Sequence, residues 1–212
     1  MTSATPDEAW QSLIAGNARF IAGEPAHPHQ DVRLREQLVD GQYPSVAIFG
    51  CSDSRLAAEI IFDLGLGDAF VIRNAGQVAS PSVLGSLEYA VGVLEVPLIL
   101  VLGHDSCGAV RAAIDSQAAD AAALTPNVAG LIAPIVPAVR RVARARRDEP
   151  LDISRIDAGE VGREHLRDTI TDLLTGSELI SRKVVDGSLG IVGANYRLHE
   201  GRAVPDVLLG LS

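Results

Sequence analysis

The sequence contains few aromatic and sulfur-containing residues. Aromatic residues occupy 4% of its 212 positions, and there are two cysteines, one tryptophan and one methionine. So few cysteines exclude a disulfide-rich scaffold, in which several bridges replace a large core. An apolar fraction of 47% must instead build the core, mainly from alanine, valine, leucine and isoleucine. The length fits one globular unit, and we predict a single domain over residues 1–212.

The sequence also lacks an excess of positive charge. Its 18 basic and 27 acidic residues give a net charge of −9 at pH 7, which disfavours nucleic acid and anionic membranes as partners. One basic cluster is present without aromatic residues that could stack on bases, so we interpret it as the solvated face of a helix. The cluster consists of Arg140, Arg141, Arg144, Arg146 and Arg147.

Long apolar runs are absent as well. The longest run, residues 96–103, is far too short to cross a bilayer. The first ten residues show neither the basic start nor the apolar stretch of a signal peptide. We therefore predict a cytoplasmic protein without a membrane partner. In that reducing compartment Cys51 and Cys107 are not expected to form a stable disulfide.

The apolar residues follow an alternating pattern along the chain. Short runs rich in β-branched and large aliphatic residues predict buried strands at Ser45–Phe49, Ala69–Arg73, Val96–Leu102 and Leu189–Asn195. Helical spacing predicts helices at Leu56–Phe62, at Ser82–Leu94, in the alanine-rich segment after His104 to about Leu124, and over Gly159–Val185. This alternation predicts an α/β fold with a central, mostly parallel sheet flanked by helices.

Two further segments have their own character. Residues 125–150 can begin a helix at Pro126, but Pro134 and Pro137 predict a break or kink. An amphipathic helix at Pro6–Ala22 belongs to an N-terminal helical arm, residues 1–40, that precedes the first strand. Its apolar face must dock either on its own body or on a partner subunit.

Polar residues follow two of the predicted strands directly. The first strand leads into Cys51-Ser52-Asp53-Ser54-Arg55, and the third leads into His104-Asp105-Ser106-Cys107-Gly108. In open α/β sheets, ligands bind beyond the carboxyl ends of the strands. If the two strands are neighbours, these loops meet at one edge of the sheet.

Two thiols and one imidazole at such an edge are suited to zinc. Zinc takes thiolate and imidazole ligands in tetrahedral geometry, and Cys51, His104 and Cys107 supply three of them. Three protein ligands leave the fourth position for water or substrate, which is typical of a catalytic site. The other histidines, His27, His29, His165 and His199, lie in segments that resemble loop or helix surface and are not expected to bind zinc.

Two thiolates neutralise the charge of zinc and make it a mild Lewis acid, so the site needs help from neighbours. Asp53 can accept a hydrogen bond from the zinc-bound water, or act as a fourth ligand itself. Arg55 can hold that carboxylate in a bidentate pair and keep it ionised.

Together, these motifs resemble those of the β-class carbonic anhydrases. CSDSR at 51–55 and HDSCG at 104–108 carry the resemblance, and FVIRNAG at 70–76 and LEYAV at 87–91 extend it. The resemblance implies one zinc ion per chain on Cys51, His104 and Cys107, with Asp53 and Arg55 as the catalytic dyad. It further implies dimers or tetramers in which the N-terminal arm packs on a partner subunit.

The resemblance also implies a substrate pocket and a mechanism. Zinc-bound hydroxide would attack carbon dioxide to give bicarbonate and a proton, and Asp53 would take the fourth zinc position in an inactive state at low pH. One subgroup has a regulatory bicarbonate site, which Arg73 matches, although a tryptophan of that site is replaced by Ile48. The residues matching the pocket are Gln42, which would act across the dimer interface, Phe70, Ala75, Tyr89 and Gly108.

Other functions fit parts of the same pattern. Cys107 with His104 could form a thiol hydrolase, but a base three residues from its nucleophile is an unusual arrangement. A non-catalytic zinc-stabilised binding protein would have no use for an ionised Asp53. A carbonyl sulfide or carbon disulfide hydrolase on the same scaffold would act on linear, apolar substrates of similar shape.

Overall fold

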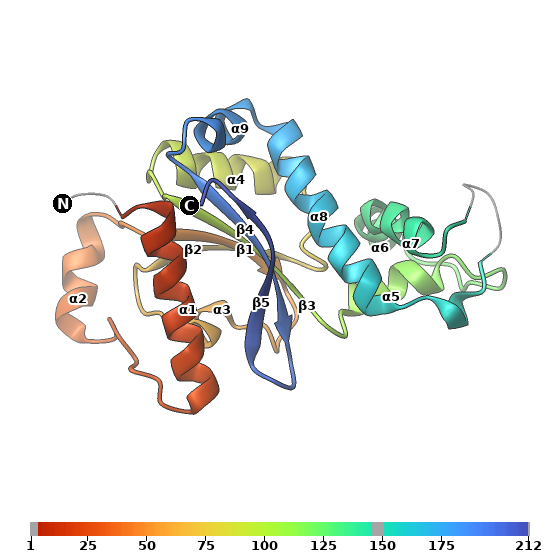
Figure 1. Cartoon of the computed structure of the whole chain (residues 1–212), viewed down its shortest axis with the longest axis horizontal. Coiled ribbons are helices and arrows are strands. Elements are labelled where there is room, and N and C mark those ends of the chain that lie inside the picture. Colours follow the sequence, from red (N-terminus) through yellow and green to blue (C-terminus); the bar gives the residue numbers. More distant parts are fainter. Residues whose placement is uncertain (1–3, 146–150, 212) are drawn as a thin grey trace.

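The computed structural model describes residues 4–145 and 151–211 and contains a five-stranded sheet in the order β2-β1-β3-β4-β5 (Figure 1). The first four strands are parallel to their neighbours, and β5 is antiparallel to β4 at one edge. This arrangement confirms the predicted α/β fold. The strands are β1 (Val46–Cys51), β2 (Ala69–Asn74), β3 (Leu98–His104), β4 (Gly190–Arg197) and β5 (Arg202–Leu209).

Helices cover both faces of the sheet (Figure 1). Because strand residues alternate between faces, Ile48 and Leu100 pack towards α1, α3 and α5, whereas Phe49 and Val101 pack towards α4, α8 and α9. The α-helices are α1 (Pro6–Ala22), α2 (Val32–Gln37), α3 (Ala58–Ile61), α4 (Pro81–Gly92), α5 (Gly108–Asp115), α6 (Pro126–Ile132), α7 (Val136–Val142), α8 (Ala158–Gly176) and α9 (Glu178–Val185). Within the described ranges, no helix has the length and apolar character needed to span a bilayer.

The predicted helix over 159–185 is divided into two. Helix α8 ends at Gly176, and α9 begins at Glu178. Between them, the Ser177 hydroxyl accepts a hydrogen bond from the Ile180 amide at 3.3 Å and donates one to Glu88 at 2.6 Å. A serine that caps the next helix favours a break, which the apolar periodicity alone does not reveal. The alanine-rich helix is also shorter than predicted, because α5 ends at Asp115.

Strand β5 is not among the predicted strands. Its sequence has a proline at Pro205 and an acidic residue at Asp206 within an otherwise apolar run. Proline is tolerated there because β5 lies at the edge of the sheet, and its pairing with β4 is irregular at Gly193 and Ala194.

The segment with three prolines breaks as predicted. Helix α6 begins at Pro126, a short 3-10 turn contains Pro134, and α7 follows with Pro137 in its first turn. The basic cluster is only partly a solvated face, since Arg141 forms ion pairs with α8. Its partners there are Glu164 and Asp168. Arg146 and Arg147 of the predicted cluster lie outside the described residues.

The N-terminal segment has two parts with different packing. In α1, Trp10 and Leu13 are buried against the chain's own sheet and helices, so the buried face of this helix docks on its own body. Every residue of α2 is exposed or half-buried, and Val39 and Tyr43 after it are 78% and 86% exposed. That residues 1–40 pack on a partner subunit stays a prediction, and α2 with the turn after it offers exposed surface for such a contact.

Candidate metal centre

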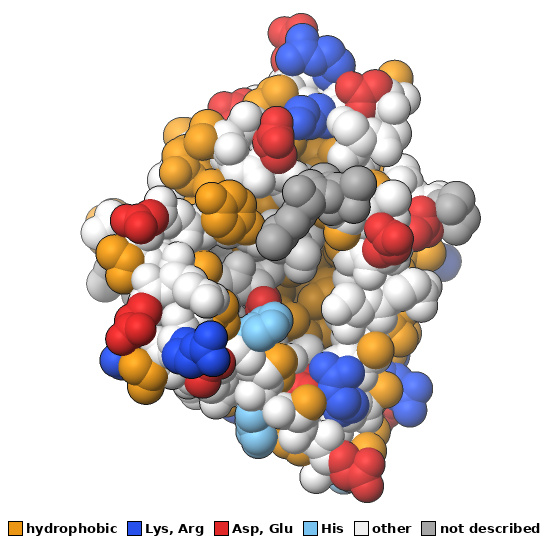
Figure 2. Space-filling model, turned by 90° about the vertical axis from the view of Figure 1, so that its left-hand side faces the viewer, with side chains coloured by type: hydrophobic (Ala, Val, Ile, Leu, Met, Phe, Trp, Pro, Cys, Tyr) orange, Lys and Arg blue, Asp and Glu red, His pale blue; other side chains and the backbone are white. Residues whose placement is uncertain are grey.

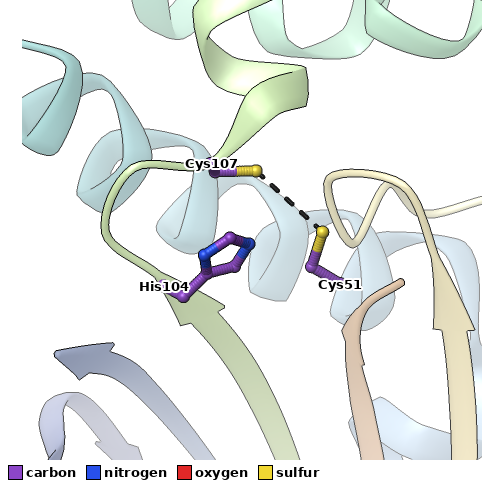
Figure 3. A group of neighbouring side chains, drawn as sticks. All are labelled: Cys51, His104 and Cys107. Carbon is purple, nitrogen blue, oxygen red and sulfur yellow. Dashed lines mark hydrogen bonds between the residues drawn. The ribbon is translucent and has the colours of Figure 1, made fainter. Parts of the chain in front are cut away.

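Three side chains that could hold a metal ion converge at the carboxyl ends of β1 and β3 (Figure 3). Cys51 ends β1, His104 ends β3, and Cys107 caps the start of α5. Because β1 and β3 are parallel neighbours, their ends meet at one edge of the sheet. The three ligand atoms lie within 4.8 Å of one another, and all three residues are buried.

The spacing and the donor chemistry fit zinc. The Cys51 and Cys107 sulfur atoms are 4.0 Å apart, against about 3.8 Å for two thiolates on a tetrahedral zinc with bonds of about 2.3 Å. The His104 Nδ1–H donates to the Asp105 carbonyl at 2.8 Å, which leaves the Nε2 lone pair free to coordinate. That buried Nε2 has no hydrogen-bond partner among the described residues.

The contact between the two thiols shifts their pKa values in opposite directions. The Cys107 contact lowers the pKa of Cys51, and a backbone amide hydrogen bond from Gly76 lowers it further. The same contact raises the pKa of Cys107, and burial adds to the effect. A thiol–thiolate pair of this kind becomes two thiolates when a divalent cation displaces the remaining proton.

Asp53 is held next to the three ligands by Arg55. The Arg55 Nε and Nη2 atoms donate to the two carboxylate oxygens at 2.9 and 2.7 Å, and the Arg55 amide adds a bond at 2.9 Å. These bonds hold the pKa of the Asp53 carboxyl well below its usual range. The Asp53 Oδ2 atom is 4.0 Å from the His104 Nε2 atom, so an ionised carboxylate stands beside the ligand cluster.

Two arginines fix the backbone around this site. Arg55 also donates to the Ser106 carbonyl at 3.2 Å, which joins the loop after β1 to the loop after β3. Arg73 on β2 donates to the Cys51 carbonyl at 3.0 Å and the Asp53 carbonyl at 2.7 Å. Arg73 therefore holds the turn that carries Cys51 and Asp53. The family resemblance relates the same arginine to a regulatory site.

Three residues predicted for the substrate pocket lie away from the metal ligands of their own chain. Gln42 is exposed before the amino end of β1, and the six residues of that strand separate its ends by about 16 Å. Phe70 pairs in register with Ala47, four positions before Cys51, or about 13 Å along the sheet. The Phe70 ring contacts that of Tyr89, with centroids 6.0 Å apart.

The other two predicted pocket residues lie at the carboxyl edge of the sheet. Gly108 is the exposed first residue of α5, directly after Cys107, and a Cβ there would meet open space. Ala75 is exposed in the turn after β2. A single chain therefore brings together the ligands, Asp53, Arg55, Ala75 and Gly108 at this edge, and not the remaining three.

Sequence patterns did not indicate the positions of two residues close to the ligands, Gly76 and His165. The Gly76 amide donates to the Cys51 sulfur at 3.3 Å, although its segment was noted only for its family resemblance. His165 was predicted at a helix surface, and this prediction is wrong, because the residue is 2% exposed and its Nε2 lies 2.7 Å from the Gly76 carbonyl. His27, His29 and His199 are exposed, as predicted.

Known proteins with similar sequences share this architecture. The carbonic anhydrase family model matches residues 46–203. Carbonic anhydrase 2 of Mycobacterium tuberculosis is 49% identical over 96% of this chain and 94% of its own length, and the carbonic anhydrase of Mycolicibacterium smegmatis is 44% identical over 95% and 94%. A tetrameric β-carbonic anhydrase of Sordaria macrospora superimposes with a TM-score of 0.69 at 25% identity, covering 92% of this chain and 95% of its own.

These matches span nearly the whole chain and include the strands that carry the site. The chain belongs to the β-carbonic anhydrase family. It is accordingly an enzyme of the lyase class to which carbonic anhydrases belong.

Proposed function

We propose that this enzyme catalyses the reversible hydration of carbon dioxide to bicarbonate and a proton, with one zinc ion per chain on Cys51, His104 and Cys107. The observation that carries the proposal is the buried ligand cluster, with the free Nε2 of His104 next to the ionised carboxylate of Asp53. When bound, zinc would supply Lewis acidity and acidify a water molecule in its fourth position.

Residues of the chain itself orient the attacking water and stabilise the developing charge. Asp53 accepts a hydrogen bond from the attacking water and orients its lone pair, and Arg55 keeps that carboxylate ionised and aimed. The Gly108 amide, at the exposed start of α5, donates towards the oxygen on which charge develops. The proton leaves to buffer.

The substrate side of the site is completed by a second copy of the chain. Gln42, Phe70 and Tyr89 are too far from their own ligand cluster to touch a substrate there, so we assign them to the cluster of a partner subunit. Phe70 and Tyr89 provide apolar surface for uncharged carbon dioxide, and Gln42 a hydrogen bond to its oxygen.

A homo-oligomer, either a dimer or a tetramer, follows from this assignment. The protein of Sordaria macrospora with the same fold is tetrameric. On the side of the molecule that carries α2, hydrophobic side chains gather around a hollow (Figure 2). The exposed Val39 and Tyr43 lie in the turn after α2, where contact with a partner would remove their apolar surface from water.

We further propose that Asp53 binds zinc directly in an inactive state at low pH, since its carboxylate already lies beside the ligand cluster. Crystal structures of the zinc-loaded protein at acidic and neutral pH would show an Asp53 oxygen on zinc at acidic pH in place of the water. High activity at acidic pH with unchanged zinc coordination would disprove this part of the proposal.

The thiols of Cys51 and Cys107 are also relevant to the cellular compartment of the protein. Both cysteines are free, with sulfur atoms 4.0 Å apart, and their oxidation to a disulfide would remove both thiolate ligands. We propose a cytoplasmic location, where reductants keep such thiols unpaired.

The deciding experiment is a stopped-flow assay of carbon dioxide hydration, paired with zinc analysis. We expect one zinc per chain, and loss of both zinc and activity on treatment with a chelator. Activity should return when zinc is restored. A zinc-loaded protein without hydration activity would disprove the proposed reaction, and activity that survives complete zinc removal would disprove the metal assignment.

A further inference from the structure

Helix α8 presents a buried histidine to the turn that follows β2. His165 is 2% exposed, and its Nε2 lies 2.7 Å from the Gly76 carbonyl. Since a carbonyl oxygen can only accept, the proton of the neutral ring is on Nε2, which donates. Burial lowers the pKa of His165 and keeps the ring neutral. Its buried Nδ1 has no hydrogen-bond partner among the described residues.

The residue that His165 holds is itself in contact with a ligand. The Gly76 amide donates to the Cys51 sulfur at 3.3 Å. Gly76 has a φ of +81°, and a Cβ at this position would lie 2.8 Å from the Ala109 Cβ. The turn therefore requires glycine for its backbone angle and for space. The Gly76 amide and carbonyl belong to neighbouring peptide planes that meet at its Cα, and because glycine restrains its own backbone least, contacts on both planes are needed to fix the turn.

An amide hydrogen bond changes what a thiolate gives to a metal. It withdraws electron density from sulfur, which makes the thiolate a weaker donor and the bound cation a stronger Lewis acid, and it fixes the direction of the sulfur. A site with two thiolates and one imidazole has most to gain from such a bond, because the thiolates already offset the charge of a divalent cation.

We propose that His165 is a positioning residue of the metal centre, which acts through the Gly76 backbone to aim an amide hydrogen bond at the Cys51 thiolate. This inference rests on the proposed zinc ligands but not on the reaction at the zinc. The ring does not touch the metal or the substrate. Its neutral Nε2–H holds one side of Gly76 while Cys51 holds the other.

The test uses the zinc-loaded and cobalt(II)-loaded protein with three substitutions. His165→Leu removes the donor at similar volume, whereas His165→Gln keeps an N–H at the same distance along the side chain. Thr169→Val is the matched control. Thr169 is buried one turn further along α8, and its hydroxyl donates to the His165 carbonyl at 2.9 Å and lies 3.3 Å from the Gln77 carbonyl, so its loss perturbs the same helix and turn but keeps the bond from the His165 ring to Gly76.

We expect His165→Leu to release zinc to a chelator about tenfold faster than the unaltered protein, because the loss of a fixed direction for the Cys51 sulfur outweighs the stronger donation of the freed thiolate. Its cobalt form should show the sulfur-to-metal charge-transfer band at longer wavelength, because a sulfur that accepts no amide hydrogen bond holds its electrons less tightly. His165→Gln should restore both properties to within about twofold, and Thr169→Val should leave the band in place.

Three results would overturn the proposal: wild-type release and spectrum in His165→Leu, no rescue by glutamine, or equal shifts in Thr169→Val at a matched melting temperature. If the leucine variant fails to fold, His165→Asn replaces it, because the shorter amide does not reach Gly76, and the comparison with glutamine decides. Neither measurement involves hydration, so a zinc-loaded protein without activity would disprove the proposed reaction and leave this test intact.

Discussion

Strand β1 has chemically different surroundings at its two ends. At the carboxyl end, Cys51 is buried, and its backbone and sulfur are bound by Arg73 and Gly76 of the same chain. Before the amino end, Gln42 and Tyr43 are exposed. In the proposed assignment, metal binding is a property of one folded chain, whereas substrate binding depends on a second copy. Substitution of a ligand at the carboxyl end should therefore reduce zinc content and turnover together. Substitutions before the amino end should reduce turnover and leave zinc content unchanged.

The largest effect is expected from Cys107→Ala at the carboxyl edge. Loss of one of three ligands should reduce zinc to a trace after dialysis and turnover to near the uncatalysed rate. Metal analysis and stopped-flow assays measure the two losses. Ser52→Ala, an exposed neighbour of Cys51, should keep zinc and activity. A zinc-loaded, active Cys107→Ala protein would contradict the ligand assignment.

Asp53→Ala should lower turnover by about 10²- to 10⁴-fold, the range typical of a positioned proton-handling group. Zinc should remain at one per chain, since the three ligands are intact. Glu59→Ala on α3, which removes an exposed carboxylate, serves as the control and should be active. Near-normal turnover of Asp53→Ala would refute a catalytic role for this carboxylate.

At the other end of β1, Val39→Asp should separate the subunits. Desolvating a carboxylate costs several kcal/mol, enough to raise a subunit dissociation constant about 100-fold or more. We expect smaller species in analytical ultracentrifugation, with zinc retained and turnover reduced. Val185→Asp changes a residue on α9 that is 86% exposed and should leave the assembly intact. Full activity of separated Val39→Asp subunits would show that one chain suffices.

A smaller effect is expected from Gln42→Ala. Loss of one hydrogen bond to the substrate, worth about 1.4 kcal/mol, should lower kcat/KM about tenfold. Zinc content and sedimentation should not change. Asn127→Ala, which alters an exposed amide on α6, away from the N-terminal arm, provides the comparison. Equal kinetics for both variants would remove Gln42 from the substrate pocket.

The smallest effect concerns stability and pH. Burial lowers the pKa of His165 in the folded protein, so below the unfolded value of about 6.5 the unfolded chain binds a proton that the folded chain refuses. This histidine therefore contributes less stability as the pH falls below about 6.5. The free energy of unfolding, measured in urea, should fall between pH 7.5 and pH 5.5. This fall should be smaller in His165→Gln by about 1 kcal/mol. An equal reduction in His199→Gln, at an exposed position, would contradict this origin.

The convergence of the three candidate ligands was predictable from the sequence because the elements that carry them are local. An apolar strand followed at once by Cys51 or His104 marks a carboxyl end, and parallel neighbouring strands bring such ends together. The dyad of Asp53 and Arg55 is also local, since two residues within one turn form it.

The missed features depend on contacts between distant segments. His165 lies 89 positions from Gly76, and its helical spacing does not distinguish a buried polar position from a surface one. The edge strand β5 tolerates Pro205 because only one of its sides pairs. The packing of Trp10 on its own chain likewise depends on tertiary structure, since an amphipathic helix does not specify which apolar surface covers it.

In the proposed assembly, β1 ends at a metal ligand of one site and is preceded by Gln42, which serves the neighbouring site, so two defective chains should repair each other. Mixing Cys107→Ala chains with Gln42→Ala chains and allowing them to reassemble should give heterodimers with one complete site. That site combines the metal cluster of one subunit with Gln42 of the other. Complementation between two variants of a single enzyme would follow from the six residues of β1 and the opposite surroundings of its ends.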